Sequence, residues 1–228
     1  MYHLFLICSA IQTNNKPLNY HPRRSVFTHE ERFKQTLETI HSIRVKVPNA
    51  YIVLIEVTPL KEQFQSILEK KVNYLFKTHT IPEVFEITEG PLKGLGEITS
   101  LYYYLMSDHF KEHRHQFGSL SKISGRYKLL EKFLFEVHDQ NMIALIRPYK
   151  HNYGTLDMST MFYTVPSKLF NYFIIACQLC SKHVGLLEGH SLESIFPGCL
   201  QEAGIPIYLK TPLYVGGEVG PWGGFVMH

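Results

Sequence analysis

The chain has 228 residues, of which 45% are hydrophobic and 19% charged, and its formal net charge is +3. This composition is typical of a globular protein with a substantial core and excludes an intrinsically disordered chain. The length fits a single domain. Because the basic residues are dispersed, we expect no nucleic-acid partner. No apolar run reaches the ~18 residues of a membrane span, so we expect no transmembrane segment.

Four cysteines are present: Cys8, Cys177, Cys180 and Cys199. Cys177 and Cys180 form a C-x-x-C pattern, but their apolar neighbours are typical of a buried helix and no second pair completes a zinc site. We therefore predict buried structural thiols in a reducing compartment. The N-terminus lacks the basic region of a signal peptide, and the expected location is the cytoplasm, or the host cytoplasm for a viral protein.

The first half of the chain alternates predicted strands with predicted helices. Residues Tyr2–Ser9 form a short apolar run, which is typical of a buried strand. Thr28 precedes Glu31 by three residues, and this capping-box pattern predicts a helix that ends before Pro48. The further expected elements are a strand at Tyr51–Glu56, a helix at Lys61–Lys71, a strand at either Val72–Phe76 or Val84–Ile87, a helix from Gly94 through Met106, and a strand at Gly118–Ile123.

In the second half the pattern predicts three strands and two helices. The alternation over the first 130 residues indicates a largely parallel sheet and an α/β fold. The expected elements are strands at Met142–Arg147, Ser159–Val165 and Ile205–Leu209, a helix from Pro166 to about Cys180, and a helix from about Ser191.

A polar, cationic turn follows the strand at Gly118–Ile123. It carries Ser124, Gly125, Arg126 and Tyr127. Glycine lets the backbone approach a ligand closely, and arginine and lysine suit a phosphate group. Since open α/β sheets bind ligands at the carboxyl ends of their strands, we place the functional site here.

Two further groups could bind an anion. Arg23, Arg24 and Ser25 precede the first predicted helix, and Arg32 and Gln35 lie on it; the alternative is a solvated loop and helix face. Lys93-Gly-Leu-Gly-Glu97 either binds a phosphate or forms a plain tight turn. The pattern does not decide between the two, because it has neither the Walker nor the Rossmann spacing.

The remaining candidates lie in less specific patterns. Glu193 falls at a predicted helix start among apolar residues, where it is either a general base or an acid of the capping turn. The glycine-rich segment 216–224 around the single tryptophan is either a loop that closes over a ligand or a frayed end. The histidines at 109, 113 and 115 have metal-like spacing but are better explained as a solvated helix end. Other acids of the second half are Asp157, Glu188 and Glu202.

The chain resembles a group of glycosyltransferases from polysaccharide gene clusters and large DNA viruses. The resemblance spans about Leu6 to Gly224, and its most specific part is the Lys-x-Ser-Gly-Arg-Tyr block. The stretches that carry it are Arg24-Ser-x-Phe-x-x-x-Glu-Arg32-x-x-Gln-Thr36, Thr39-Ile-x-Ser-Ile43, Pro48-Asn-Ala50, Leu54-Ile-Glu56, Gly96-Glu97, Lys122-Ile-Ser-Gly-Arg-Tyr127 and Ser191-Leu-Glu193.

The resemblance implies a GT-A-like, three-layer α/β/α fold with a mostly parallel central sheet. It implies one domain over residues 1–228, with a nucleotide-sugar-binding half at 1–130 and an acceptor half at 131–228. The implied activity is transfer of a sugar from a nucleotide-sugar donor to a glycan or another hydroxyl acceptor. The implied donor-binding residues are Ser9, Ala10, Gln12, Arg24, Arg32, Glu56, Lys93, Gly96, Glu97, Lys122, Ser124, Gly125 and Tyr127.

The sequence departs from the family pattern in one respect: it contains no Asp-x-Asp, the motif that usually holds Mn²⁺ or Mg²⁺. The charge of a departing nucleoside diphosphate must then be stabilised by cations, of which Arg126 is the first candidate. We expect an inverting enzyme without a metal or other cofactor, in which Glu193 is the base and Glu188 and Asp157 are its rivals; a retaining enzyme is the alternative. The alternatives are a metal recruited by Asp157 or Asp139, a catalytically silent nucleotide-sugar- or glycan-binding module, and a sugar-1-phosphate nucleotidyltransferase.

Overall fold

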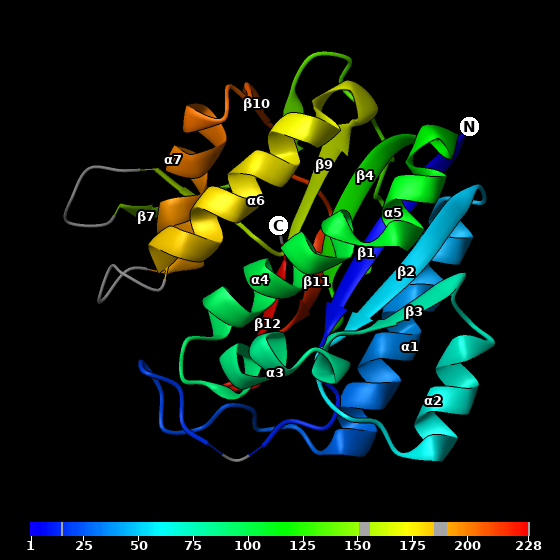
Figure 1. Ribbon diagram of the computed structural model, residues 1–228, viewed down its shortest axis with the longest axis vertical. Coiled ribbons are helices and arrows are strands. Elements are labelled where there is room, and N and C mark those ends of the chain that lie inside the picture. Colours follow the sequence, from blue (N-terminus) through cyan, green and yellow to red (C-terminus); the bar gives the residue numbers. More distant parts are fainter. Residues whose placement is uncertain (15, 151–155, 185–190, 228) are drawn as a thin grey trace.

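The structure is a computed structural model that describes residues 1–14, 16–150, 156–184 and 191–227. Its described part forms three layers, with a central sheet between two sets of helices (Figure 1). In spatial order the strands of the central sheet are β10 (Ile207–Leu209), β6 (Met142–Ala144), β9 (Phe162–Pro166), β4 (Phe117–Ser124), β1 (Tyr2–Ser9), β2 (Ala50–Glu56) and β3 (Tyr74–Lys77). Only β9 runs antiparallel to its neighbours among these strands, so the predicted mostly parallel sheet is confirmed.

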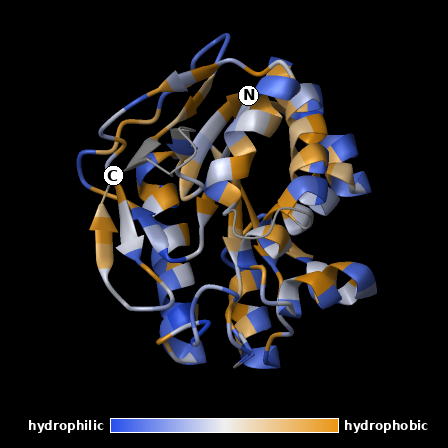
Figure 2. Cartoon of the chain, turned by 90° about the vertical axis from the view of Figure 1, so that its left-hand side faces the viewer, coloured by the Kyte–Doolittle hydropathy of each residue, from blue (hydrophilic) through white to orange (hydrophobic). Residues whose placement is uncertain are grey.

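The inner strands β1, β2 and β4 are buried on both faces over most of their length. In β1, Leu4 and Leu6 point into one core while Phe5 and Ile7 point into the other. Such strands have nearly continuous apolar sequences rather than alternating ones. Figure 2 shows the result, with largely orange strands between helices that carry blue on their outer faces.

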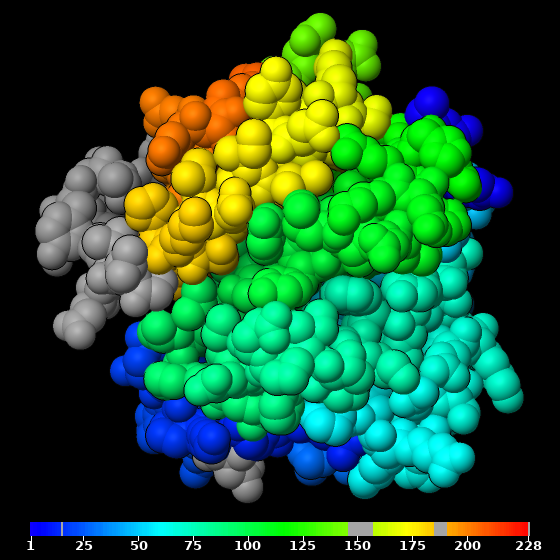
Figure 3. Space-filling model, viewed as in Figure 1, coloured from blue at the N-terminus to red at the C-terminus, as the bar shows by residue number. Residues whose placement is uncertain are grey.

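Helices cover both faces of the sheet. α1 and α2 lie on one face, and α4, α5, α6 and α7 on the other. On the face seen in Figure 3, the side chains of α3 to α6 form the middle of the surface and β1 is hidden behind them. The helices are α1 (His29–Lys46), α2 (Glu62–Glu69), α3 (Pro82–Glu89), α4 (Lys93–Met106), α5 (Asp108–His113), α6 (Phe170–Val184) and α7 (Leu192–Glu202).

The first predicted helix starts and ends as expected. Thr28 is the N-cap of α1, and its hydroxyl accepts a hydrogen bond from the Glu31 N–H at 3.2 Å. The Glu31 carboxylate accepts one from the Thr28 N–H at 2.7 Å. The predicted capping box is therefore confirmed, and α1 ends at Lys46, before Pro48.

Two predicted elements differ from the structure. Of the two alternatives for the third strand, Val84–Ile87 is wrong because this segment lies in α3, whose first residue is Pro82 with a backbone suited to a helix start. The predicted strand Met142–Arg147 is two strands: β6 in the central sheet, and β7 (Ile146–Lys150), which pairs with β8 (Leu156–Met158).

The glycine-rich tail is neither a frayed end nor wholly a loop. β11 (Val215–Glu218) pairs with β12 (Phe225–Met227) and with β5 (Tyr127–Leu129), the strand that follows the Ser124–Tyr127 turn. Gly217 is required here, because an added Cβ would lie 2.1 Å from the Arg126 carbonyl oxygen. The tail thus ends beside the predicted site.

The thiols are buried as predicted. Cys177, Cys180 and Cys199 lie in the core, Cys8 is partly buried, and all four are free thiols. By contrast, His109 is not a solvated residue: its ring stacks on Tyr74 with centroids 3.7 Å apart. No helix in the described part of the chain is both long and apolar enough to cross a membrane.

Candidate functional site

A pocket lies where β1 and β4 end, beside the start of α4. β1 and β4 are parallel neighbours, with Cys8 opposite Ser124, so their carboxyl ends meet at one edge of the sheet. The pocket is lined by Cys8, Ser9, Ala10, Thr13, Arg24, Arg32, Val57, Thr58, Thr88, Glu89, Lys93, Gly96, Glu97, Ser100, Ser124 and Arg126. Nine of these sixteen are residues that the sequence suggested.

The turn after β4 is fixed against β1 and α1. The Gly125 N–H donates to the Cys8 carbonyl at 2.8 Å, and its own carbonyl accepts from the Thr36 hydroxyl at 3.2 Å. A Cβ at Gly125 would lie 3.1 Å from both the Cβ and the Oγ of Ser9. Gly125 therefore serves a close approach between strands and places Arg126 at the pocket wall.

Three arginines reach the pocket from different elements. Arg32 of α1 is buried, donates to the Ala10 carbonyl and to the Ser25 hydroxyl, and its pKa falls to about 9, through burial first and then the charge of Arg126. Arg24 donates to the Thr88 carbonyl at 3.1 Å, at the end of α3. Arg126 donates its Nε–H to the Glu218 carbonyl at 3.1 Å, and among the described residues its terminal nitrogens have no acceptor.

The fourth cation is Lys93, the first residue of α4. Burial, followed by the positive charge of Arg126, lowers the pKa of Lys93 to about 7. The first turn of a helix also presents free N–H groups, which favour anions. Ser100, two turns further along the same face, is fully buried and its hydroxyl has no hydrogen-bond partner among the described residues. These features favour an oxyanion as ligand.

Gly94 and Gly96 serve helix packing, and the part of this segment in binding a phosphate stays a prediction. They lie inside the first turn of α4, and the Gly96 N–H donates to the Leu92 carbonyl. A Cβ at Gly94 would lie 2.8 Å from the Leu192 Cβ, and one at Gly96 would lie 3.0 Å from the Thr88 Cα. The two glycines thus allow α7 and α3 to pack closely against α4.

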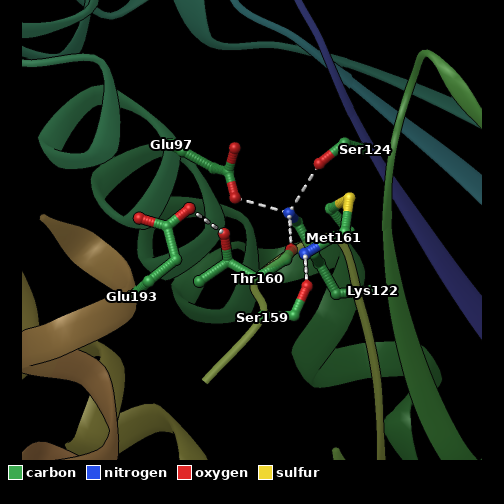
Figure 4. A network of polar contacts seen from close by, with 7 residues as sticks. All are labelled: Glu97, Lys122, Ser124, Ser159, Thr160, Met161 and Glu193. Carbon is green, nitrogen blue, oxygen red and sulfur yellow. Dashed lines mark hydrogen bonds and ion pairs between the residues drawn. The ribbon is translucent and has the colours of Figure 1, made fainter. Parts of the chain in front are cut away.

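Lys122 is fully buried at the centre of a polar network (Figure 4). Its ammonium group contacts the Glu97 carboxylate, the Thr160 carbonyl and, at 3.0 Å, the Ser124 hydroxyl. Burial alone would raise the pKa of Glu97, but the charges of Lys122 and Lys93 outweigh it and the pKa lies below its ordinary value. Three acceptors take the three ammonium N–H groups, so Lys122 orders the site rather than offering them to a ligand.

Glu193 joins this network from α7. Ser191 is the N-cap and Glu193 the second helical residue, and its carboxylate accepts a hydrogen bond from the Thr160 hydroxyl at 3.2 Å (Figure 4). The charges of both carboxylates act on the exposed residue Tyr20: burial first, then Glu193 and more weakly Glu97, raise its pKa, while the charges of Arg126 and Arg24 lower it. The acid predicted from its position at a helix start thus lies next to the pocket.

Other predicted residues do not line the pocket. Glu56 is fully buried and accepts hydrogen bonds from the Ile11 and Thr58 N–H groups, both at 3.0 Å, which shapes the loop after β1. Gln12 accepts from the Lys61 N–H before α2. Tyr127 in β5 and Asp157 in β8 are buried outside the pocket wall. Their ligand-binding or catalytic roles stay predictions, and Glu188 lies outside the described residues.

Several residues of the site lie in no recognisable sequence pattern. Thr160 links Lys122 to Glu193 through its carbonyl and hydroxyl, yet it lies in an ordinary bend between β8 and β9. Ser100 is an interior helix residue, and Tyr20 stands in a loop without a motif. Only the packing of α4, α7 and β9 brings these residues together.

Similarity to known proteins is visible in the fold rather than in the sequence. No protein-family model matches the chain, and a search of curated proteins finds no match. The structure resembles the nucleoside-diphosphate-sugar pyrophosphorylase from Vibrio cholerae RC9, with a TM-score of 0.50 and 10% identity over 93% of each chain. It also resembles the glycosyltransferase GlyE of Streptococcus pneumoniae TIGR4, with a TM-score of 0.51 and 10% identity over 91% of this chain and 45% of GlyE. The fold is GT-A-like.

The donor atoms around the GT-A-like site do not fit a divalent ion. Among the described residues, no group of three or more His, Cys, Asp or Glu side chains lies close enough to share a metal. Two carboxylates line the pocket: that of Glu97 is paired with Lys122, and that of Glu89 accepts a hydrogen bond from the Asn14 side-chain amide. We therefore derive no step through Mn²⁺ or Mg²⁺, and metal independence stays a prediction.

Proposed function

We propose that this protein is an inverting glycosyltransferase that moves a sugar from a nucleoside-diphosphate sugar to a hydroxyl acceptor without a metal held by Asp-x-Asp. One observation carries the proposal: a single pocket at the carboxyl ends of β1 and β4 combines four cationic side chains with a neighbouring pair of carboxylates. Ligands of open α/β sheets bind at this edge. The cationic residues are Arg24, Arg32, Lys93 and Arg126.

The cations would bind the diphosphate of the donor. Among the described residues, the terminal nitrogens of Arg126 have no acceptor. Lys93 contributes its ammonium group, and the N-terminus of α4, where Lys93 lies, contributes free backbone N–H groups. When the bond between the anomeric carbon and the diphosphate oxygen breaks, the electron pair stays on that oxygen. Preorganised positive groups stabilise this developing charge, which is the task a metal has in other enzymes.

Glu193 would act as the general base. As the acceptor oxygen attacks the anomeric carbon, its proton passes to the Glu193 carboxylate. Glu97 is less suited to this step, because the charge of Lys122 lowers its pKa and so makes it a weaker proton acceptor. Lys122 would be a positioning residue, because it orders Glu97 directly and Glu193 through Thr160.

Hydrolysis of candidate donors tests the proposal. We expect the protein to release nucleoside diphosphate slowly from at least one of UDP-, GDP- or dTDP-sugars, and to do so equally in EDTA, because the described residues offer no metal site. Released nucleotide can be measured by chromatography.

Three other results would each contradict part of the proposal. Activity that is lost in EDTA and restored by Mn²⁺ would show a metal mechanism. Formation of nucleoside triphosphate from donor and pyrophosphate would identify a nucleotidyltransferase. Donor binding without any turnover, in the presence of glycan acceptors, would indicate a catalytically silent module.

The pKa of Lys93 predicts a pH dependence of anion binding. Lys93 is charged below its pKa of about 7 and loses its charge above it, so affinity for an oxyanion should weaken as pH rises above 7, by up to about tenfold per pH unit. Sulfate is a suitable probe because it does not titrate in this range. Its stabilisation of the protein against heat should be larger at about pH 6 than at about pH 8.5, with NaCl at matched ionic strength as the reference.

Lys93→Met is the matched variant for this experiment. It should bind sulfate more weakly at both pH values and remove most of the difference between them. An equal pH effect in Lys93→Met would assign the titration to another group, such as one of the histidines.

A further inference from the structure

An aromatic surface lies beside the pocket, next to Arg126. We define it as the side chains of Tyr20, His21 and Trp222. Tyr20 and Trp222 are 57% and 60% exposed, and the rings of His21 and Trp222 meet edge to face with centroids 5.5 Å apart. Large aromatic rings exposed beside a polar pocket are uncommon without a binding role.

Both halves of this surface are held in place by backbone contacts. The Val26 N–H donates to the Gly220 carbonyl at 2.9 Å, which joins the segment after β1 to the loop between β11 and β12. Within the first segment, the Leu18 N–H donates to the His21 carbonyl at 2.9 Å and presents Tyr20 at a turn. Gly223 has a φ of +72°, a conformation that favours glycine, directly after Trp222.

The surface is continuous with the site. Gly220 packs on the Arg126 guanidinium, since a Cβ there would lie 3.4 Å from its Cζ. The Asn19 N–H donates to the Pro91 carbonyl at 3.2 Å, which ties Tyr20 to the segment that leads into α4.

We propose that the aromatic surface is the acceptor subsite and that its ligand is a saccharide. A sugar ring has an apolar C–H face that suits an aromatic ring and a hydroxyl edge that suits polar groups such as those of Tyr20 and His21. This inference rests on the proposed function and narrows its acceptor from any hydroxyl compound to a glycan.

The single tryptophan makes the test specific. Trp222 is the only tryptophan in the chain, so tryptophan emission reports this surface alone. A panel of neutral oligosaccharides (gluco-, galacto-, manno- and chito-trisaccharides) is titrated into the full-length protein. We expect a saturable change in emission intensity with at least one of them. Vesicles of phosphatidylcholine and phosphatidylserine, titrated in parallel, should leave the emission unchanged.

Variants assign the binding to named rings. Trp222→Ala and Tyr20→Ala should each weaken saccharide binding, measured by calorimetry, by roughly tenfold, which corresponds to about 1.4 kcal/mol. Trp222→Phe, which keeps an aromatic ring, should retain more affinity than Trp222→Ala. Tyr172→Ala is the matched control, because Tyr172 is 50% exposed on α6, away from the pocket, and should bind as the wild type does.

The outcomes separate this inference from the proposed function. Donor hydrolysis by the wild type with no emission change across the panel would overturn the acceptor subsite and leave the transferase intact. A response to vesicles but not to saccharides would make the surface a membrane contact instead. Saccharide binding at Trp222 without any donor hydrolysis would support the subsite while the transferase proposal fails.

Discussion

Glu193→Gln is expected to lower sugar transfer roughly 10²-fold or more while donor affinity stays near that of the wild type. Glutamine keeps the size of the side chain and can still accept the hydrogen bond from the Thr160 hydroxyl, so the network in Figure 4 should persist. What it loses is the ability to take a proton from the acceptor hydroxyl. Transfer is measured with the donor that the wild type hydrolyses fastest, and donor affinity by calorimetry.

Two further substitutions decide between candidate bases. Glu202→Gln is the matched control, because Glu202 is exposed at the far end of the same helix and should leave transfer unchanged. Asp157→Asn addresses the rival base. If Glu193→Gln transfers sugar normally and Asp157→Asn does not, then Asp157 is the base and the acceptor approaches from the side of β8.

The elements best predicted from sequence are those whose signals are local. β1 has the predicted bounds, Tyr2–Ser9, because its central residues Leu4–Ile7 are buried on both faces and give an apolar run. The start of α1 follows from the capping box, which involves only Thr28 and Glu31. The turn at Ser124–Tyr127 follows a central strand as predicted, although this strand is less apolar and contains three serines and Lys122.

The predictions were weaker where a residue's surroundings come from distant parts of the chain. The sequence around Lys122 predicts a phosphate ligand beside an arginine. In the structure its ammonium group instead donates to the Glu97 carboxylate and the Thr160 carbonyl, which lie 25 and 38 residues away in the chain. Gly94 and Gly96 resemble a phosphate loop, whereas their small size serves helix packing against Leu192 and Thr88. The same residue type can bind a ligand or serve packing and ion pairing, and only tertiary contacts distinguish the two roles.

The glycine-rich tail illustrates the same limit for backbone structure. Glycine lowers strand propensity, so Val215–Glu218 does not read as a strand. In the structure Gly217 is needed because β11 lies against the Arg126 carbonyl, and the pairing with β5 supplies the order that local propensity lacks. This pairing also brings Glu218 to Arg126, a contact between residues 92 positions apart.

Arg126→Ala is expected to lower kcat/KM by a factor that corresponds to a loss of about 2–4 kcal/mol of transition-state stabilisation. This is the scale of removing one preorganised group that stabilises developing charge. The variant should fold, because the side chain is only partly buried and donates a single hydrogen bond, to the Glu218 carbonyl. Thermal unfolding checks the fold, and initial rates of donor hydrolysis in EDTA check the activity. Lys128→Ala is the matched control, since Lys128 is an exposed cation on the adjacent strand that lies outside the pocket wall.

The loss in Arg126→Ala should also depend on pH. Burial is the main cause of the lowered pKa of Lys93 and the charge of Arg126 the second, so removing Arg126 raises this pKa and keeps more of Lys93 protonated above pH 7. Below pH 7 Lys93 is charged in both proteins, and the full effect of the missing guanidinium should be seen. Above pH 7 the variant gains a charge on Lys93 that the unliganded wild type has partly lost, and the two rates should converge. A loss of rate that stays constant from about pH 6 to about pH 8.5 would show that Arg126 and Lys93 do not act on the same phosphate group. Unchanged hydrolysis by a well-folded Arg126→Ala would remove Arg126 from the mechanism.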